Sequence, residues 1–156
     1  MSAFDQASRI TPFLWFEHNA EEAVDFYLGI FQSSRKIDVL RNPGALPGAE
    51  GTVVTIAFEL DGTRFTALNG GTPPAYTEAV SFVVRCDSQQ EIDFYWEKLV
   101  AGGSPIACGW LKDKFGVRWQ IVPANIAELV RSRKGMEAMM TMTKFDVAAL
   151  ERAGKE

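Results

Sequence analysis

The sequence predicts an α+β fold made of two tandem βαβββ modules with helices after the second. Asp-Phe-Tyr occurs at residues 25–27 and again at 93–95, an offset of 68 residues, 93 − 25. The same offset places Leu14 over Phe82 and Thr11 over Ala79 without a gap. A repeated order of strand, helix and three strands predicts two mostly antiparallel sheets, each with a helix on one face. We expect the opposite faces of the sheets to enclose a cavity.

The first module is predicted to span residues 10–69. Its opening segment, ITPFLWF at 10–16, is β-prone and apolar on both faces, which is typical of a buried strand. Asn19 is a candidate N-cap for the helix that follows, since acidic residues come directly after it and favour a first helical turn. Apolar residues then recur at helical spacing until Ser33-Ser34 ends the helix.

A short strand, an exposed loop and a hairpin complete this module, at residues 37–40, 41–51 and 53–68. Asp61-Gly62 lies at the centre of the hairpin and is a strong signal for a two-residue turn. Glycines and prolines at 70–77 then mark a linker.

The second module is predicted to span residues 79–123 in the same order. A strand at 79–85 precedes a helix at 91–100 that Asp87 or Ser88 can cap, and Gly102-Gly103 ends the helix. Short strands follow as far as Pro123.

The last hairpin of this module has two chemically different faces. Gly116 can adopt the positive φ that its tight loop needs. Strand alternation then places Trp119 and Ile121 on one face and Arg118, Gln120 and Val122 on the other. We expect the mixed polar face to serve a function.

Residues 124–156 form a predicted helical extension, with helices at 126–130, 135–142 and 146–153, so the chain is one domain over 1–156. Its methionine cluster is interpreted as a pliable packing surface, against this chain or another, with a ligand contact as the alternative.

Composition excludes several classes of function. The chain has 16 Lys and Arg against 20 Asp and Glu, a net charge of −4, so no basic excess favours nucleic acid. We find neither a signal peptide nor an apolar run of the roughly 18–20 residues that a membrane span needs. Cys86 and Cys108 are interpreted as buried thiols rather than a disulfide, which favours a cytoplasmic protein.

Several motifs carry a resemblance that covers nearly the whole chain, from about Ile10 to Ala153. The most specific is CGWLKDKFGVRWQIVP at Cys108–Pro123, and further ones are at 20–23, 68–71, 78–82, 91–93 and 95–99. The chain resembles the vicinal oxygen chelate superfamily (glyoxalase/bleomycin resistance/dioxygenase), and most closely its PhnB-like family. That family is often labelled 3-demethylubiquinone-9 3-methyltransferase. The resemblance implies a homodimer.

The methyltransferase label finds no support in the residues. Common S-adenosylmethionine enzymes place a glycine-rich loop between a parallel strand and a helix. No G-x-G-x-x-G occurs here, and Gly70-Gly71 and Gly102-Gly103 fit a turn and a helix stop. We therefore expect no cofactor, and methyl transfer is possible by the family label only.

The resemblance also implies where a metal would bind, at Thr11, Asn69, Ala79 and Gln120. Divalent metals in such sites favour imidazole nitrogens and carboxylate oxygens. These positions offer a hydroxyl, two amides and a methyl group, and the single histidine, His18, lies beyond the first strand. We expect no metal site.

The predicted site binds a small organic ligand. Alternation on the expected strands assigns Phe13, Trp15, Ala67 and Asn69 to the cavity face, with a packed core filled by these residues as the alternative. Arg118 is expected at the cavity mouth, paired with an acid, or ready for an anionic ligand. Cys108 is either a reactive thiolate or a small buried residue. The complete set of predicted ligand-binding residues is Phe13, Trp15, Asn69, Ser81, Cys108, Arg118 and Gln120.

Three classes of function follow. We favour a metal-free ligand-binding protein, as the bleomycin-sequestering members of the superfamily are. The alternatives are an enzyme, acting by methyl transfer or through Gln120, Arg118 or Cys108, and a dimeric interaction protein without a ligand.

Overall fold

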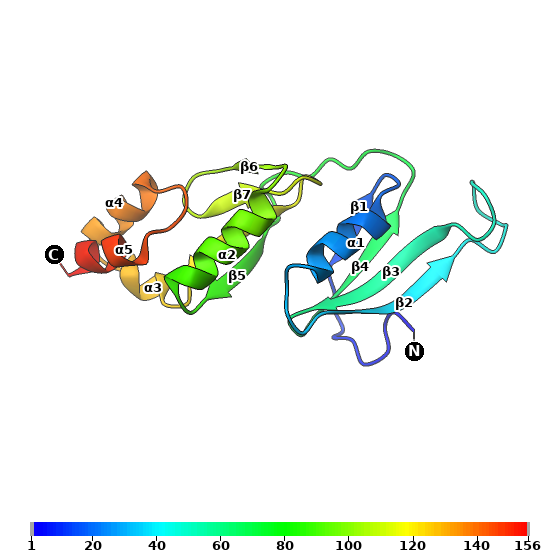
Figure 1. Ribbon diagram of the computed structural model, residues 1–156, viewed down its shortest axis with the longest axis horizontal. Helices are drawn as coiled ribbons and strands as arrows, with labels where there is room; N and C mark the ends of the chain where they lie inside the picture. The colour runs from blue at the N-terminus through cyan, green and yellow to red at the C-terminus, as the bar shows by residue number, and fades with distance from the viewer. Residues whose placement is uncertain (1, 156) are drawn as a thin grey trace. The chain divides into compact units, whose positions relative to one another are not determined.

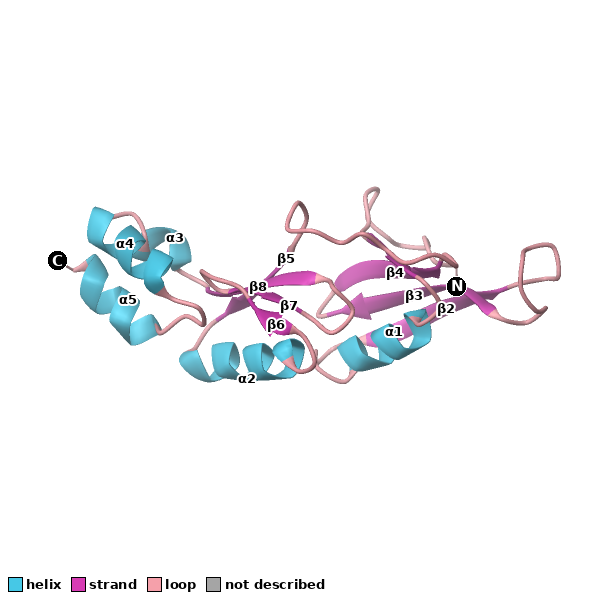
Figure 2. Ribbon diagram, turned by 90° about the horizontal axis from the view of Figure 1, so that it is seen from above, coloured by secondary structure: helices cyan, strands magenta, loops and turns pink. Residues whose placement is uncertain are grey.

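The computed structural model describes residues 2–155, and the chain divides into two compact units, Met1–Ala75 and Tyr76–Glu156. Each unit contains one four-stranded sheet with a helix against one face (Figure 1 and Figure 2). The predicted α+β fold with two tandem modules is confirmed, whereas the cavity between the sheets stays a prediction.

The first unit has the predicted order of elements, β1 (Phe13–Phe16), α1 (Ala20–Leu28), β2 (Arg35–Arg41), β3 (Val53–Leu60) and β4 (Thr63–Asn69). Its sheet has the order β1-β4-β3-β2, in which only the β1–β4 pair is parallel. The first strand begins at Phe13 rather than at Ile10, whose side chain is 87% exposed.

The second unit repeats this order with β5 (Phe82–Cys86), α2 (Gln89–Val100), β6 (Ser104–Pro105), β7 (Trp110–Lys112) and β8 (Arg118–Pro123). Its sheet has the order β5-β8-β7-β6, and again only the pair that contains the first strand is parallel. Two sheets with the same topology confirm the repeat that the Asp-Phe-Tyr motifs predict.

The start of α1 is capped from another strand. Asn19 makes no side-chain cap hydrogen bond, so the predicted cap is wrong. Instead Ala20 N donates to Asn69 Oδ1 at 2.9 Å, which satisfies one of the unpaired amides at the helix start. The helix buries Ala23, Val24 and other small or apolar residues against β3 and β4.

The start of α2 is capped locally. Ser88 Oγ accepts from Glu91 N at 3.2 Å, and the Glu91 carboxylate accepts in return from Asp87 N at 2.7 Å. This is a form of the reciprocal capping box. Of the two predicted candidates, Asp87 and Ser88, the N-cap is Ser88.

Positive φ angles lie at the predicted turns. Asp61 (φ 46°) and Gly62 (φ 85°) form the two-residue turn between β3 and β4, and Gly116 (φ 93°) lies in the loop between β7 and β8. Both φ angles at 61–62 are positive, as a type I′ hairpin turn requires.

The helical extension consists of α3 (Ile126–Leu129), α4 (Arg133–Thr141) and α5 (Val147–Gly154). These helices share a small core of Val122, Leu129, Phe145 and Leu150, against which Met139 and Met142 are packed. Met136 and Met140 are largely exposed. Of the helices in residues 2–155, none combines the length and apolar character needed to cross a membrane.

Candidate functional site

The face of each sheet opposite its helix, here called the uncovered face, holds the candidate site. In β1, Leu14 and Phe16 are buried at 5% and 1% exposure, whereas Phe13 and Trp15 are 52% and 40% exposed. Alternation along the strand thus places Phe13 and Trp15 on the uncovered face, as the sequence predicts.

For the neighbouring strand, β4, the faces predicted for its residues are wrong by one position. Trp15 is paired with Leu68 and Phe16 with Asn69. Paired residues of adjacent strands point to the same face, so Leu68 lies on the uncovered face and Asn69 on the helix face. Assigning Ala67 and Asn69 to the face of Trp15 is therefore wrong. Polar and apolar residues occur on both faces of β4, so its alternation does not show the register.

Asn69 instead joins three elements of the first unit. Besides accepting from Ala20 N, it donates from Nδ2 to Glu21 Oε1 at 2.7 Å and to the Val53 carbonyl at 3.1 Å. Its amide therefore links β4 to the starts of α1 and β3, and Asn69 also lines the pocket at this end of the sheet.

A pocket of about 540 Å³ opens where β1 and β4 end, and we call it the Trp15 pocket. Volumes of roughly 300–1,000 Å³ are usual for small-molecule sites. The pocket is bordered by the loop between β2 and β3 and by the start of α1. The side chains that give it its character are Trp15, Leu46, Val54, Leu68, Glu17 and Glu21.

The indole of Trp15 is held in place by two neighbours. Trp15 Nε1 donates to the Thr72 carbonyl at 2.8 Å. The ring lies so close to Gly70 that a Cβ atom at that position would overlap it. A residue without a side chain is therefore required at position 70 for the indole to form this wall of the pocket.

The loop on the other side of the pocket is ordered by Asn42, which is only 2% exposed. Its Oδ1 accepts from Gly44 N and Leu46 N at 2.8 and 3.2 Å, and its Nδ2 donates to the Leu46 carbonyl at 3.1 Å. A single buried amide thus fixes the loop that contributes Leu46.

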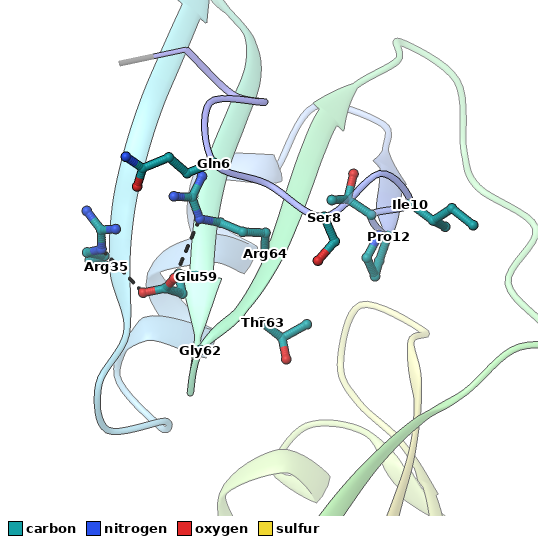
Figure 3. A pocket seen from close by; sticks show the side chains of 10 residues that line it. Gln6, Ser8, Ile10, Pro12, Arg35, Glu59, Gly62, Thr63 and Arg64 are labelled. Carbon is teal, nitrogen blue, oxygen red and sulfur yellow. Dashed lines mark hydrogen bonds and ion pairs between the residues drawn. The ribbon is translucent and has the colours of Figure 1, made fainter.

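A second pocket, of about 330 Å³, lies where β2 and β4 begin (Figure 3). Glu59 projects between two arginines there, with Arg35 Nε at 3.3 Å and Arg64 Nε at 3.5 Å (Figure 3). Arg64 also donates to the Asp5 carbonyl at 3.2 Å. Thr11 lines this pocket, but the charged groups pair with one another rather than facing a ligand.

In the second unit the predicted polar face is present. Val83 is paired with Gln120, and Gln120 with Trp110, so these three residues share the uncovered face. Ser81 lies two residues before Val83, and its Oγ accepts a 2.9 Å hydrogen bond from Gln120 Nε2. The structure therefore brings Ser81 and Gln120 together.

Arg118 is paired with an acid, one of the three roles considered for it. Its Nε lies 3.3 Å from Glu78 Oε1, and its Nη1 donates to the Tyr76 and Gly116 carbonyls at 3.1 and 2.6 Å. A backbone hydrogen bond of Glu78, followed by the guanidinium, lowers the pKa of that carboxyl. The guanidinium is therefore already neutralised within its own unit.

The two cysteines lie in different surroundings. Cys108 lies in the loop before β7 with φ 58° and packs against the core of the helical extension. Cys86 is buried on β5, and desolvation raises the pKa of its thiol to about 12. A thiol held in its protonated form is a poor nucleophile.

The residues present do not fit a divalent metal. Within residues 2–155, no three His, Cys, Asp or Glu side chains gather in a way that could hold an ion. His18 is 81% exposed, and its Nδ1 is 3.8 Å from Glu17 Oε2. Thr11, Asn69 and Gln120 offer one hydroxyl and two amides, which are weak ligands for such ions.

Two βαβββ units with identical strand order define a protein of the vicinal oxygen chelate class. The profile of the family described as 3-demethylubiquinone-9 3-methyltransferase matches residues 8–122. The chain therefore belongs to this family, whose members are called PhnB-like. No curated protein sequence matches the chain significantly.

Solved structures agree with this assignment. The PhnB protein of Bacillus cereus is 36% identical over 75% of this chain and 100% of its own, with a TM-score of 0.68. A Pseudomonas aeruginosa protein is 20% identical, covering 75% and 98%, with a TM-score of 0.61. The fosfomycin resistance protein FosX of Listeria monocytogenes, solved with Mn(II) and sulfate, is 14% identical, covering 73% and 89%, with a TM-score of 0.55. The last two show the fold alone.

Proposed function

We propose that this protein binds a small organic ligand against the uncovered sheet faces and does so without a metal. The observation that carries the proposal is the exposure of two aromatic side chains on this face, one of which, Trp15, lines a pocket of ligand size. Phe13 and Trp15 are 52% and 40% exposed on a strand whose other residues are buried. Apolar walls with a few fixed polar groups are the usual composition of small-molecule sites.

The polar groups on these faces suit hydrogen bonding better than metal or nucleophilic chemistry. Gln120 uses one amide hydrogen to bind Ser81, which leaves its carbonyl oxygen as an acceptor in a fixed orientation. Arg118 is satisfied by Glu78 and two carbonyls. Thr11, Asn69, Ala79 and Gln120, where the resemblance to the superfamily would place metal ligands, carry no imidazole or carboxylate.

The proposed functional form is a homodimer in the cytoplasm. Phe13, Val80 and Val83 are each more than half exposed, and apolar side chains in this number favour a partner surface. A second copy is the simplest partner, because two-module proteins of this kind would pair such surfaces about a twofold axis. The free thiols of Cys86 and Cys108 favour a reducing compartment.

Native mass spectrometry of freshly purified protein, followed by a thermal-shift screen of organic compounds, tests the proposal. We expect a dimer that carries an organic mass without metal, or a compound class that raises the melting temperature. Trp15→Ala should abolish the effect, because Trp15 lines the pocket. Phe94→Ala is the matched control, because Phe94 is 44% exposed but lies on α2. A chain that retains nothing and is stabilised by no compound would refute the proposal.

A further inference from the structure

We infer that the Trp15 pocket selects an organic cation, an amine or ammonium group on an apolar body. This inference rests on the proposed ligand-binding function and assigns a chemical class to the ligand. It replaces the anionic ligand that Arg118 suggested in the sequence, since that guanidinium is already paired with Glu78.

The pocket offers a rigid apolar surface against which the apolar part of the ligand can pack. Leu46, Val54 and Leu68 line the pocket together with the Trp15 indole. The indole is fixed by its hydrogen bond to Thr72 and by its close approach to Gly70. Binding a ligand therefore does not require this side chain to lose conformational freedom. The loop that holds Leu46 is fixed by Asn42 in the same way.

The charged groups that line the pocket determine which sign of charge a ligand can carry. Glu17 and Glu21 both line it, and no lysine or arginine does among the residues that the structure describes. Glu21 is held by Asn69 Nδ2 at 2.7 Å, so its carboxylate is positioned before any ligand arrives. His18, which also lines the pocket, lies against Glu17 at 3.8 Å. An anion would meet two carboxylates here, whereas a cation is attracted by both and by the indole face.

Three compounds with one skeleton separate charge from shape. The probes are 3-phenylpropylamine, 3-phenylpropan-1-ol and 3-phenylpropanoate, which are cationic, neutral and anionic near neutral pH. Binding is followed by the NMR signal of the Trp15 indole N–H, assigned by its loss in Trp15→Phe. We expect the amine to bind about tenfold more tightly than the alcohol, and the carboxylate more weakly than both. The preference should decrease as salt is added.

Two isosteric substitutions that remove negative charge test the role of the acids. Glu17→Gln with Glu21→Gln should reduce the preference for the amine to about threefold or less, since only the indole then favours a cation. The amide introduced by Glu21→Gln keeps an oxygen that can accept from Asn69, and the single variant Glu17→Gln covers the case that the double variant does not fold. Glu22→Gln is the matched control, because Glu22 is exposed on the same helix and does not line the pocket.

The outcomes separate this inference from the proposed function. Equal affinity for the three probes, an unchanged preference in the double glutamine variant, or an unmoved Trp15 signal would each overturn the cation assignment. Ligand binding in general is decided independently, by the retained mass and the compound screen. A retained ligand that is neutral or anionic would therefore support the proposed function and refute this inference.

Discussion

Gln120 Nε2 donates a 2.9 Å hydrogen bond to Ser81 Oγ on the uncovered face of the second sheet. The bond joins β8 to the segment that leads into β5 and fixes the orientation of the glutamine amide. The amide and the hydroxyl of this pair are weak ligands for divalent transition metals. The pair therefore suits recognition of a ligand by hydrogen bonds.

The first prediction concerns metal ions. A metal that binds only the folded state raises the melting temperature. Because no cluster of metal ligands occurs within residues 2–155, we expect Mn²⁺ or Zn²⁺ to change the melting temperature by less than about 1 °C. Differential scanning fluorimetry and calorimetric titration measure this. A saturable metal site that is lost in Gln120→Ala but kept in Gln90→Ala, an exposed residue on α2, would contradict the prediction.

The second prediction concerns the contact between Gly70 and Trp15. Gly70→Ala should lower the free energy of unfolding of the first unit by about 1–3 kcal/mol, because the new methyl group overlaps the indole. Urea denaturation followed by tryptophan fluorescence measures the change. Gly29→Ala, where the nearest atoms lie at 3.4 Å, should change stability by less than about 1 kcal/mol.

A double variant separates steric overlap from other effects at this position. In Trp15→Ala the space beside Gly70 is vacated, so adding Gly70→Ala should cost less than it does in the wild type. Equal costs in both backgrounds would show that the indole is not the reason for glycine at position 70.

Elements with local signals could be predicted from the sequence. The Asp61-Gly62 turn, the Ser88 cap and the alternation of Gln120 with Trp119 each depend on residues within a few positions of one another. Turn chemistry and strand periodicity are encoded at that range, so both the repeat and the mixed polar face were found.

Features that depend on distant residues could not be predicted in this way. Asn69 caps a helix 49 residues away, and Arg118 pairs with Glu78 across 40 residues. The pairing with β1 determines which residues of β4 lie on each face. The sequence of β4 alone does not, because polar and apolar residues occur on both of its faces. The Trp15 pocket depends on a loop folding beside β1, which local pattern does not specify.

The third prediction concerns a buried carboxylate in the loop between β7 and β8. Asp113 is 1% exposed; its Oδ1 accepts from Phe115 N and Val117 N, and its Oδ2 accepts from Trp119 Nε1 at 2.9 Å. Asp113→Ala should destabilise the second unit by about 2–4 kcal/mol, because these donors lose their partner in a buried site. Denaturant unfolding measures the loss.

Two further variants test the cause of that loss. Asp113→Asn keeps an oxygen for the two backbone amides but turns an N–H group toward the Trp119 indole, so an intermediate loss is expected. Glu137→Ala, which removes an exposed pair with Arg133, should change stability by less than about 1 kcal/mol. A cost for Asp113→Ala no larger than this control would show that the carboxylate does not hold the loop.

The last prediction concerns pH. Desolvation by burial, followed by the Glu91 and Asp87 carboxylates, raises the pKa of the Cys86 thiol from 9.0 to about 12. Above a pH of about 9 the unfolded chain releases a proton that the folded chain keeps, so stability falls as pH rises. Urea titrations between pH of about 8 and about 11 should show a steeper loss of unfolding free energy in the wild type than in Cys86→Ala. Equal slopes in the wild type and in Cys86→Ala would contradict the burial of Cys86.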